Sequence, residues 1–141
     1  MKKILLSLAI VLGLATGAVA KSNYTRDSSV LPQKALTTLS RHFPADVSMV
    51  KVEPGEFEVI LTDGTEITFY TSGDWDDVEV PRGKEVPAGL IPQGIKNYVS
   101  QNYAGQKIES IDKNRNGYDV ELSNGIDLKF NSQGQFMRCG D

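Results

Sequence analysis

The chain has 141 residues, of which 40% are hydrophobic and 23% are charged, and its formal net charge is −3. This moderate acidity argues against nucleic acid or an anionic membrane as the main partner, because both attract clustered lysine and arginine. The length suits a single domain. The one cysteine, Cys139, cannot form an internal disulfide, so packing alone must hold the fold.

Residues 1–20 are typical of a secretory signal peptide. Lys2 and Lys3 precede an apolar run over residues 4–14, and an A-x-A ending closes at Ala20. The run is shorter than the ~20 residues of a membrane-spanning helix. We therefore expect cleavage after Ala20 and no membrane insertion of the mature chain. Two lysines and no acidic residue are removed, which changes the charge from −3 to −5. The polar segment 21–29 is predicted to be flexible.

Residues 30–80 and 90–141 are predicted to be two tandem copies of one module, joined by a connection at 81–89 that is rich in proline, glycine and charge. Leu31-Pro32-Gln33 matches Ile91-Pro92-Gln93, and residues 57–64 match residues 118–125 after a shift of one position. One copy of ~55 residues is only marginally stable by itself. Two copies are therefore expected to share one hydrophobic core.

Each copy begins with a helical pattern. Its apolar residues recur about every fourth position and form one stripe that must dock on another element. In the first copy these residues are Leu31, Ala35, Leu39 and Phe43; in the second they are Ile91, Ile95, Val99 and Tyr103. Pro32 and Pro92 suit the first turn, where a missing N–H costs nothing.

A period of two follows each helix and predicts about four antiparallel strands. A three-residue loop over residues 62–64 pairs Val59 with Ile67 and makes one face apolar, with Gly64 in a left-handed bulge position. Residues 123–125 give the same register in the second copy, where Val120 pairs with Leu128. The predicted class is α+β, with the copies forming one continuous sheet of about eight strands and both helices on one face.

These motifs resemble those of the PepSY-like proteins, which are similar to the β-lactamase inhibitor protein and common as duplicated secreted proteins in Bacteroidetes. The resemblance rests on the order Leu31-Pro32, Phe43-Pro44, residues 57–64 and residues 73–78, and on the corresponding residues of the second copy. It implies a periplasmic, non-enzymatic binding or inhibitory role and supplies no catalytic residues. Ala104 departs from it, since a proline is expected after Tyr103.

Two acidic groups invite a metal-binding interpretation. Residues 112–117 fit the start of a calcium-binding EF-hand loop, but position 12 of that loop is Ser123 rather than glutamate, so a polar hairpin turn is favoured. Around Trp75, a strand places Asp74 and Asp76 on one face and Asp77 and Glu79 on the other. This splitting is more typical of a charged edge strand than of a cation site. Small-ligand or cation binding by the acidic loops stays open as the alternative function.

No pattern indicates an enzyme, a cofactor or a metal ligand set. His42 is the only histidine, and no serine or cysteine stands in a context that suggests activation by it. The CxxC and histidine spacings of zinc sites are absent from the sequence.

The predicted binding surface is the sheet face away from the helices, and its partner is expected to be a periplasmic protein or peptide. Met49, Ile60 and Tyr70 are apolar side chains among polar ones there, with Lys51 opposite Glu58. Scattered exposed apolar residues would have the same appearance. Trp75 is either a core residue or an interface anchor. The oligomeric state and the role of Cys139 stay open.

Overall fold

The computed structural model describes residues 23–140, so the predicted signal peptide lies outside the described residues. These residues have an α+β fold with one antiparallel sheet of nine strands, which lie in the sheet in the order of the chain. No helix within residues 23–140 is long and apolar enough to cross a membrane.

The strands form two groups of four, and each group follows a helix. Helix α1 (Gln33–His42) precedes the first group, which is β2 (Val47–Glu53), β3 (Glu56–Leu61), β4 (Glu66–Tyr70) and β5 (Trp75–Glu79). Helix α2 (Gln93–Asn102) precedes the second group, which is β6 (Ile108–Asn114), β7 (Gly117–Leu122), β8 (Asp127–Asn131) and β9 (Phe136–Cys139). The additional strand β1 (Tyr24–Thr25) pairs with β2, and short 3₁₀ helices η1 (Ser28–Val30) and η2 (Ala88–Leu90) precede the two α-helices.

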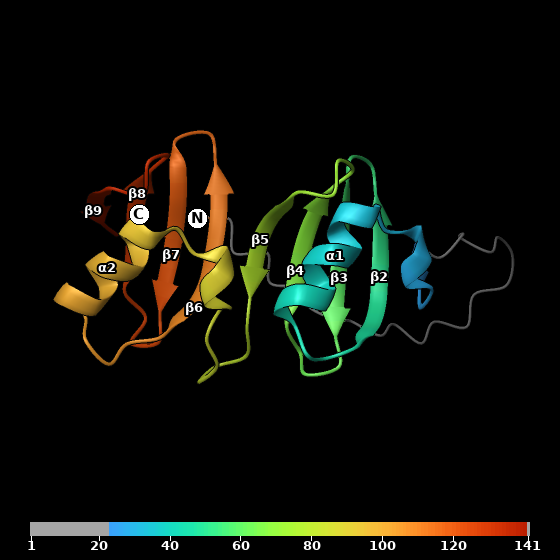
Figure 1. The fold of residues 1–141 in the computed structure, drawn as a ribbon, viewed down its shortest axis with the longest axis horizontal. Helices are drawn as coiled ribbons and strands as arrows, with labels where there is room; N and C mark the ends of the chain where they lie inside the picture. Colours follow the sequence, from blue (N-terminus) through green and yellow to red (C-terminus); the bar gives the residue numbers. More distant parts are fainter. Residues whose placement is uncertain (1–22, 141) are drawn as a thin grey trace, which may run out of the picture.

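Both helices cover the same face of the sheet (Figure 1). No helix within residues 23–140 covers the opposite face, which we call the open face. Each helix docks through its apolar stripe: Ala35 and Leu39 of α1 are buried, as are Ile95 and Val99 of α2. These side chains belong to one continuous core with alternate residues of the central strands, including Val50, Val59, Ile67, Phe69, Val78, Ile111, Val120, Leu128 and Phe130. Burial of this face explains the period of two in β3, β4, β7 and β8, whereas register shifts interrupt it in the pairings of β2 with β3, β4 with β5 and β6 with β7.

The predicted three-residue loops and their registers are confirmed. The Leu61 N–H donates to the Thr65 carbonyl at 2.9 Å, and Val59 pairs with Ile67. The corresponding bond from Leu122 to Ile126 is also 2.9 Å, and Val120 pairs with Leu128. Gly64 has φ +91°, a conformation that glycine adopts without the steric cost other residues incur.

Two features of the fold were not predicted from the sequence. Tyr24 and Thr25, within the segment expected to be flexible, form β1 and pair with Lys51 and Val50. In the connection at 81–89, Val86 is buried, and its N–H donates to the Ile108 carbonyl at 2.8 Å. The connection is therefore packed against the second group of strands rather than being only a solvated linker.

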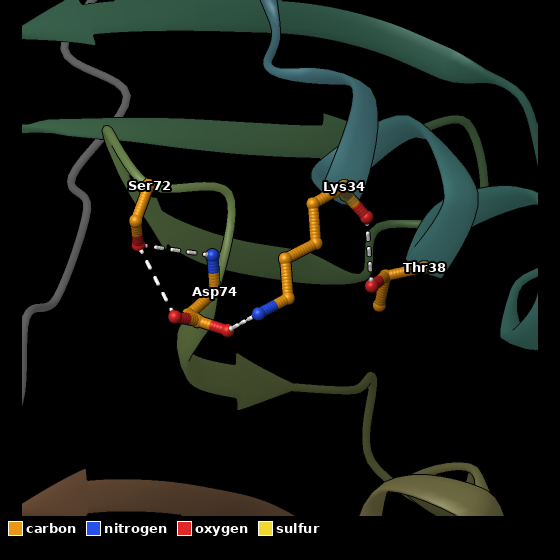
Figure 2. Close-up of polar contacts among 4 residues, drawn as sticks. All are labelled: Lys34, Thr38, Ser72 and Asp74. Atoms are coloured by element: carbon orange, nitrogen blue, oxygen red, sulfur yellow. Dashed lines mark hydrogen bonds and ion pairs between the residues drawn. The ribbon is translucent and has the colours of Figure 1, made fainter.

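A polar contact links α1 to the turn before β5. Lys34 of the first helical turn forms an ion pair with Asp74, whose carboxylate also accepts a bond from the Ser72 hydroxyl (Figure 2). Thr38 donates its hydroxyl to the Lys34 carbonyl at 3.1 Å. Both charged side chains are at least half exposed, at 63% and 50%. The contact thus lies at the rim of the buried helix–sheet interface.

Candidate functional site: the open face of the sheet

The open face carries one lateral row of side chains that crosses all nine strands. Antiparallel pairing places directly opposite residues on the same face, so the registers define this row from edge to edge. From β1 to β9 its members are Tyr24, Lys51, Glu58, Thr68, Asp77, Asp112, Asp119, Lys129 and Arg138. The basic residues lie toward the two ends of the row, and the acidic residues lie between them.

Toward each end, a lysine neutralises the neighbouring carboxylates. Lys51 Nζ lies 2.5 Å from Glu53 and 3.6 Å from Glu58, and the Glu53 contact raises the pKa of this lysine. Lys129 Nζ lies 2.9 Å from Asp119, and both side chains are only 15% exposed. The outer parts of the row are therefore built as internal ion pairs.

The middle of the face has a different charge balance. Five carboxylates gather on β4, β5 and β6, and we call them the central acidic cluster: Glu66, Asp76, Asp77, Glu79 and Asp112. Burial raises the pKa of Asp77 to about 7, and the neighbouring carboxylates, first that of Asp112, add to this effect. Burial also raises the pKa of Asp112 to about 6, with Asp76 and Asp119 adding to it. The pKa of Glu66 is raised by burial and by Glu79.

A β-bulge on β5 completes this cluster. Phe69 pairs with Trp75 and Thr68 pairs with Asp77, so Asp76 is the extra residue of the bulged strand. Its carboxylate accepts a 2.5 Å hydrogen bond from the Tyr70 hydroxyl, and this bond raises the pKa of Tyr70 to about 12. The expectation that Asp76 lies on the face opposite Asp77 is therefore wrong, because the bulge breaks the alternation of side chains.

A shallow pocket adjoins the cluster on β3, β4 and β5. Four carboxylates line it together with Ile60 and Thr68: Glu58, Glu66, Asp77 and Glu79. Like charges meet here directly, since Glu66 and Glu79 are cross-strand partners. A ligand seated in this pocket would meet several negative charges and one aliphatic side chain.

Five of the six predicted binding residues lie on or beside this face. Met49 pairs with Ile60, Lys51 pairs with Glu58, and Tyr70 lies opposite Glu56. The sixth, Trp75, is on the helix side: it pairs with the buried Phe69 and packs against the core, and Lys113 Nζ lies 3.7 Å from its ring centroid. The structure thus places Trp75 away from the surface formed by the other five.

The residues that dominate the centre of the face were not predicted as a site. The interpretation of Asp74–Glu79 as part of a charged edge is wrong, because β5 lies in the interior of the sheet, between β4 and β6. Asp77 meets Asp112 only through the β5–β6 pairing. A long connection that includes a helix separates these two strands, so local alternation gives no register for them. The sequence does show that Asp77 alternates with the apolar Val78, and Asp112 with the apolar Ile111. This alternation places each aspartate on the polar face of its strand, but it does not show that the two meet.

The calcium-loop interpretation of residues 112–117 has a simpler structural counterpart. Asp112 belongs to β6 and pairs with Asp119, while Asn114 pairs with Gly117 around a tight turn. The segment is thus the polar hairpin turn that the sequence favoured. Within residues 23–140, no three histidine, cysteine, aspartate or glutamate side chains converge in a way that could hold a metal ion.

Comparison with known proteins identifies the family. Residues 55–138 match the family model described as "Putative beta-lactamase-inhibitor-like, PepSY-like". The chain belongs to the PepSY-like family. This agrees with the motif order of the sequence and with the helix-covered antiparallel sheet. No curated protein matches the chain significantly.

Three solved structures from Bacteroides support the assignment of this PepSY-like chain. A "putative periplasmic protein of unknown function" from Bacteroides vulgatus is 35% identical with a TM-score of 0.80, and the match covers 84% of this chain and 98% of that one. A "putative calcium-regulated periplasmic protein" from Bacteroides thetaiotaomicron is 30% identical with a TM-score of 0.75, over 80% and 92% of the two chains. A second Bacteroides vulgatus protein, also described as "putative periplasmic", is 31% identical with a TM-score of 0.76, over 86% and 99%.

Proposed function

We propose that this PepSY-like chain is a non-catalytic, inhibitor-like module of the periplasm that binds a protein or peptide through the open face of its sheet. The family is inhibitor-like, and the similar structures are described as periplasmic. On this proposal the signal peptide is removed after Ala20. The two groups of strands are then tandem copies of one module, in which duplication supplies a surface wide enough for a protein partner.

The observation that carries the proposal is the unneutralised centre of the open face. Among the described residues, no ion pair reaches Asp77 or Asp112, whereas Glu58 and Asp119 have lysine partners. A partner that presents lysine or arginine would supply the missing positive charge, and complementary charges of this kind favour correct docking. The nearby apolar side chains Met49, Ile60 and Tyr70 would contribute contact area.

Affinity capture from periplasmic extract tests this proposal. The purified chain is compared with Ile60→Arg, which places positive charge beside the central acidic cluster, and with Gln101→Arg, which places the same charge on the exposed surface of α2. We expect a basic protein that both the parent chain and Gln101→Arg retain and that Ile60→Arg loses at least tenfold. Equal retention by both variants, with unchanged circular dichroism, would exclude this face as the binding surface.

A second candidate, cation binding, is favoured by one observation. The relative from Bacteroides thetaiotaomicron is described as calcium-regulated, and in the present chain the negative charge of Asp76 helps to raise the pKa of both Asp77 and Asp112. These carboxylates are not arranged as a ready coordination site within residues 23–140, so a cation would have to draw them together. Calorimetric titration with calcium chloride at pH 8 distinguishes the two candidates. Heat that disappears in Asp77→Asn would support a cation site, and a titration without heat or change in melting temperature would dismiss it.

A further inference from the structure

The two groups of strands are joined in the sheet through a single ladder, between β5 and β6. This β5–β6 junction has three register pairs. Val78 and Ile111 meet on the helix side, where both are fully buried, while Asp77–Asp112 and Glu79–Ser110 lie on the open side. Two backbone bonds extend the junction, from the Val80 N–H to the Glu109 carbonyl at 2.9 Å and from the Val86 N–H to the Ile108 carbonyl at 2.8 Å.

The junction therefore combines a well-packed inner side with two opposed carboxyl groups on its outer side. Like charges directly opposite each other destabilise a strand pair. The groups that face Asp77 are all acidic: Asp112 on β6, Asp76 and Glu79 on β5, and Glu66 on β4. Asp112 faces Asp76 and Asp119, and among residues 23–140 the positive charge of Lys129 partly offsets them.

We propose that the β5–β6 junction is a pH-sensitive joint between the two halves of the sheet. When a proton occupies Asp77 or Asp112, the pair carries at most one negative charge and the ladder is tight. When both are ionised, repulsion weakens this ladder more than it weakens the ladders within each half. Like-charged pairs also occur within the halves, at Glu66–Glu79 and Asp112–Asp119. Glu79 is exposed to water and Asp119 has Lys129 as its ion-pair partner, whereas Asp77 and Asp112 are half-buried and no ion pair among the described residues reaches them.

The direction of the effect follows from linkage. Both carboxyl groups have folded-state pKa values, about 7 and about 6, above the ordinary value of 3.8. The folded chain then binds more protons than the unfolded chain between these limits. The stability that the protons contribute is fully present below about pH 4 and is lost as the pH rises through 6 and 7. A tight joint is thus expected at pH 5 and a loosened one at pH 8.5.

Hydrogen exchange with residue resolution tests the joint in the purified protein, at pH 5 and pH 8.5 with EDTA present and with correction for intrinsic exchange. The amides of Val80 and Val86 report on the junction. Those of Thr62 and Ser123, which bond to Asp46 and Lys107, are matched reporters within each half. We expect protection at the junction to fall at least about tenfold more than at the matched reporters, the change that one unit of pKa displacement produces. Equal changes at all four amides would overturn the proposal.

Variants assign the effect to the carboxyl pair. Asp77→Asn should remove most of the pH dependence at the junction, whereas Asp46→Asn, at an exposed position outside the cluster, should leave it unchanged. If Asp77→Asn does not fold, ¹³C NMR titration of the carboxyl groups in the parent protein decides the matter. Midpoints above pH 5.5 for Asp77 and Asp112 support the joint, and midpoints below pH 5 for both overturn it. Neither measurement requires a binding partner, so the result is independent of the proposed function.

Discussion

The last strands of the two halves, β5 and β9, share a local pattern but differ in environment. Each follows a turn with a buried glycine, begins with an aromatic residue and pairs through a bulge with the preceding strand. In β5, Val78 is fully buried and Trp75 is half-buried beneath Lys113. In β9, all four residues are exposed, and Phe136 stacks on Tyr98 of α2 at 4.3 Å between ring centroids. β5 is covered by the next strand, β6, whereas β9 is an edge strand of the sheet. This difference explains why corresponding residues are buried in β5 and exposed in β9.

The open faces of the halves differ while their cores agree. Val59, Ile67 and Phe69 of the first half correspond to Val120, Leu128 and Phe130 of the second, and all six are buried. On the open face, by contrast, the Met49–Ile60 pair of the first half has the Ser110–Glu121 pair as its counterpart. Core packing restricts the residue types on the inner face of both halves. Binding through the first half would restrict residue types only on the open face of that half.

The largest expected effect is in the shared core. Phe69→Ala and Phe130→Ala each remove a ring that is almost completely buried, so each should lower the free energy of unfolding by ~3–5 kcal/mol. Because one core spans both halves, we expect a single transition in urea for either variant. Two separate transitions, with only one of them shifted, would show that the halves unfold independently and would break the comparison.

A smaller effect separates β5 from β9 directly. Val78 pairs with Ile67, and Cys139 pairs with Leu128 at the matched position. Val78→Ala should cost ~2 kcal/mol, because it removes two fully buried methyl groups and leaves a cavity. Cys139→Ala should change stability by no more than about 0.5 kcal/mol, since this thiol is exposed. Similar costs for both in chemical denaturation would mean that β9 is covered in solution.

The sequence was sufficient for those parts of the fold that local patterns determine. The helices, the three-residue loops and the strand registers across those loops follow from the positions of apolar residues and from Gly64 and Gly125. A continuous sheet of about eight strands was also expected, since two marginal copies gain a shared core by packing together, and the sheet has nine strands among the described residues. Strand β1 was not predicted, because two polar residues have no period, and its pairing depends on the edge that β2 offers.

The open face was less predictable than the core. Met49, Lys51, Glu58, Ile60 and Tyr70 could be placed because hairpin registers are local. The Asp77–Asp112 pair could not be placed, since it depends on a non-local strand pairing. Asp76 lies on the open face with Asp77 rather than on the predicted opposite face, because it is the extra residue of a β-bulge. No residue type in this segment predicts that bulge. Trp75 was ambiguous because an aromatic residue suits both a core and an interface, and its pairing with Phe69 decides for the helix side.

The smallest expected effect concerns the rim of the α1 interface. Lys34 contacts Asp74 there, whereas the matched position of α2 is Gly94, which has no side chain to reach the following turn. Exposed ion pairs of this kind contribute little, because water and salt screen them. Lys34→Met keeps the aliphatic stem and removes the charge, so the melting temperature should not change measurably at either 20 mM or 500 mM sodium chloride. A clear decrease at low salt that vanishes at high salt would show instead that this contact, absent from the second half, helps to hold α1 on the sheet.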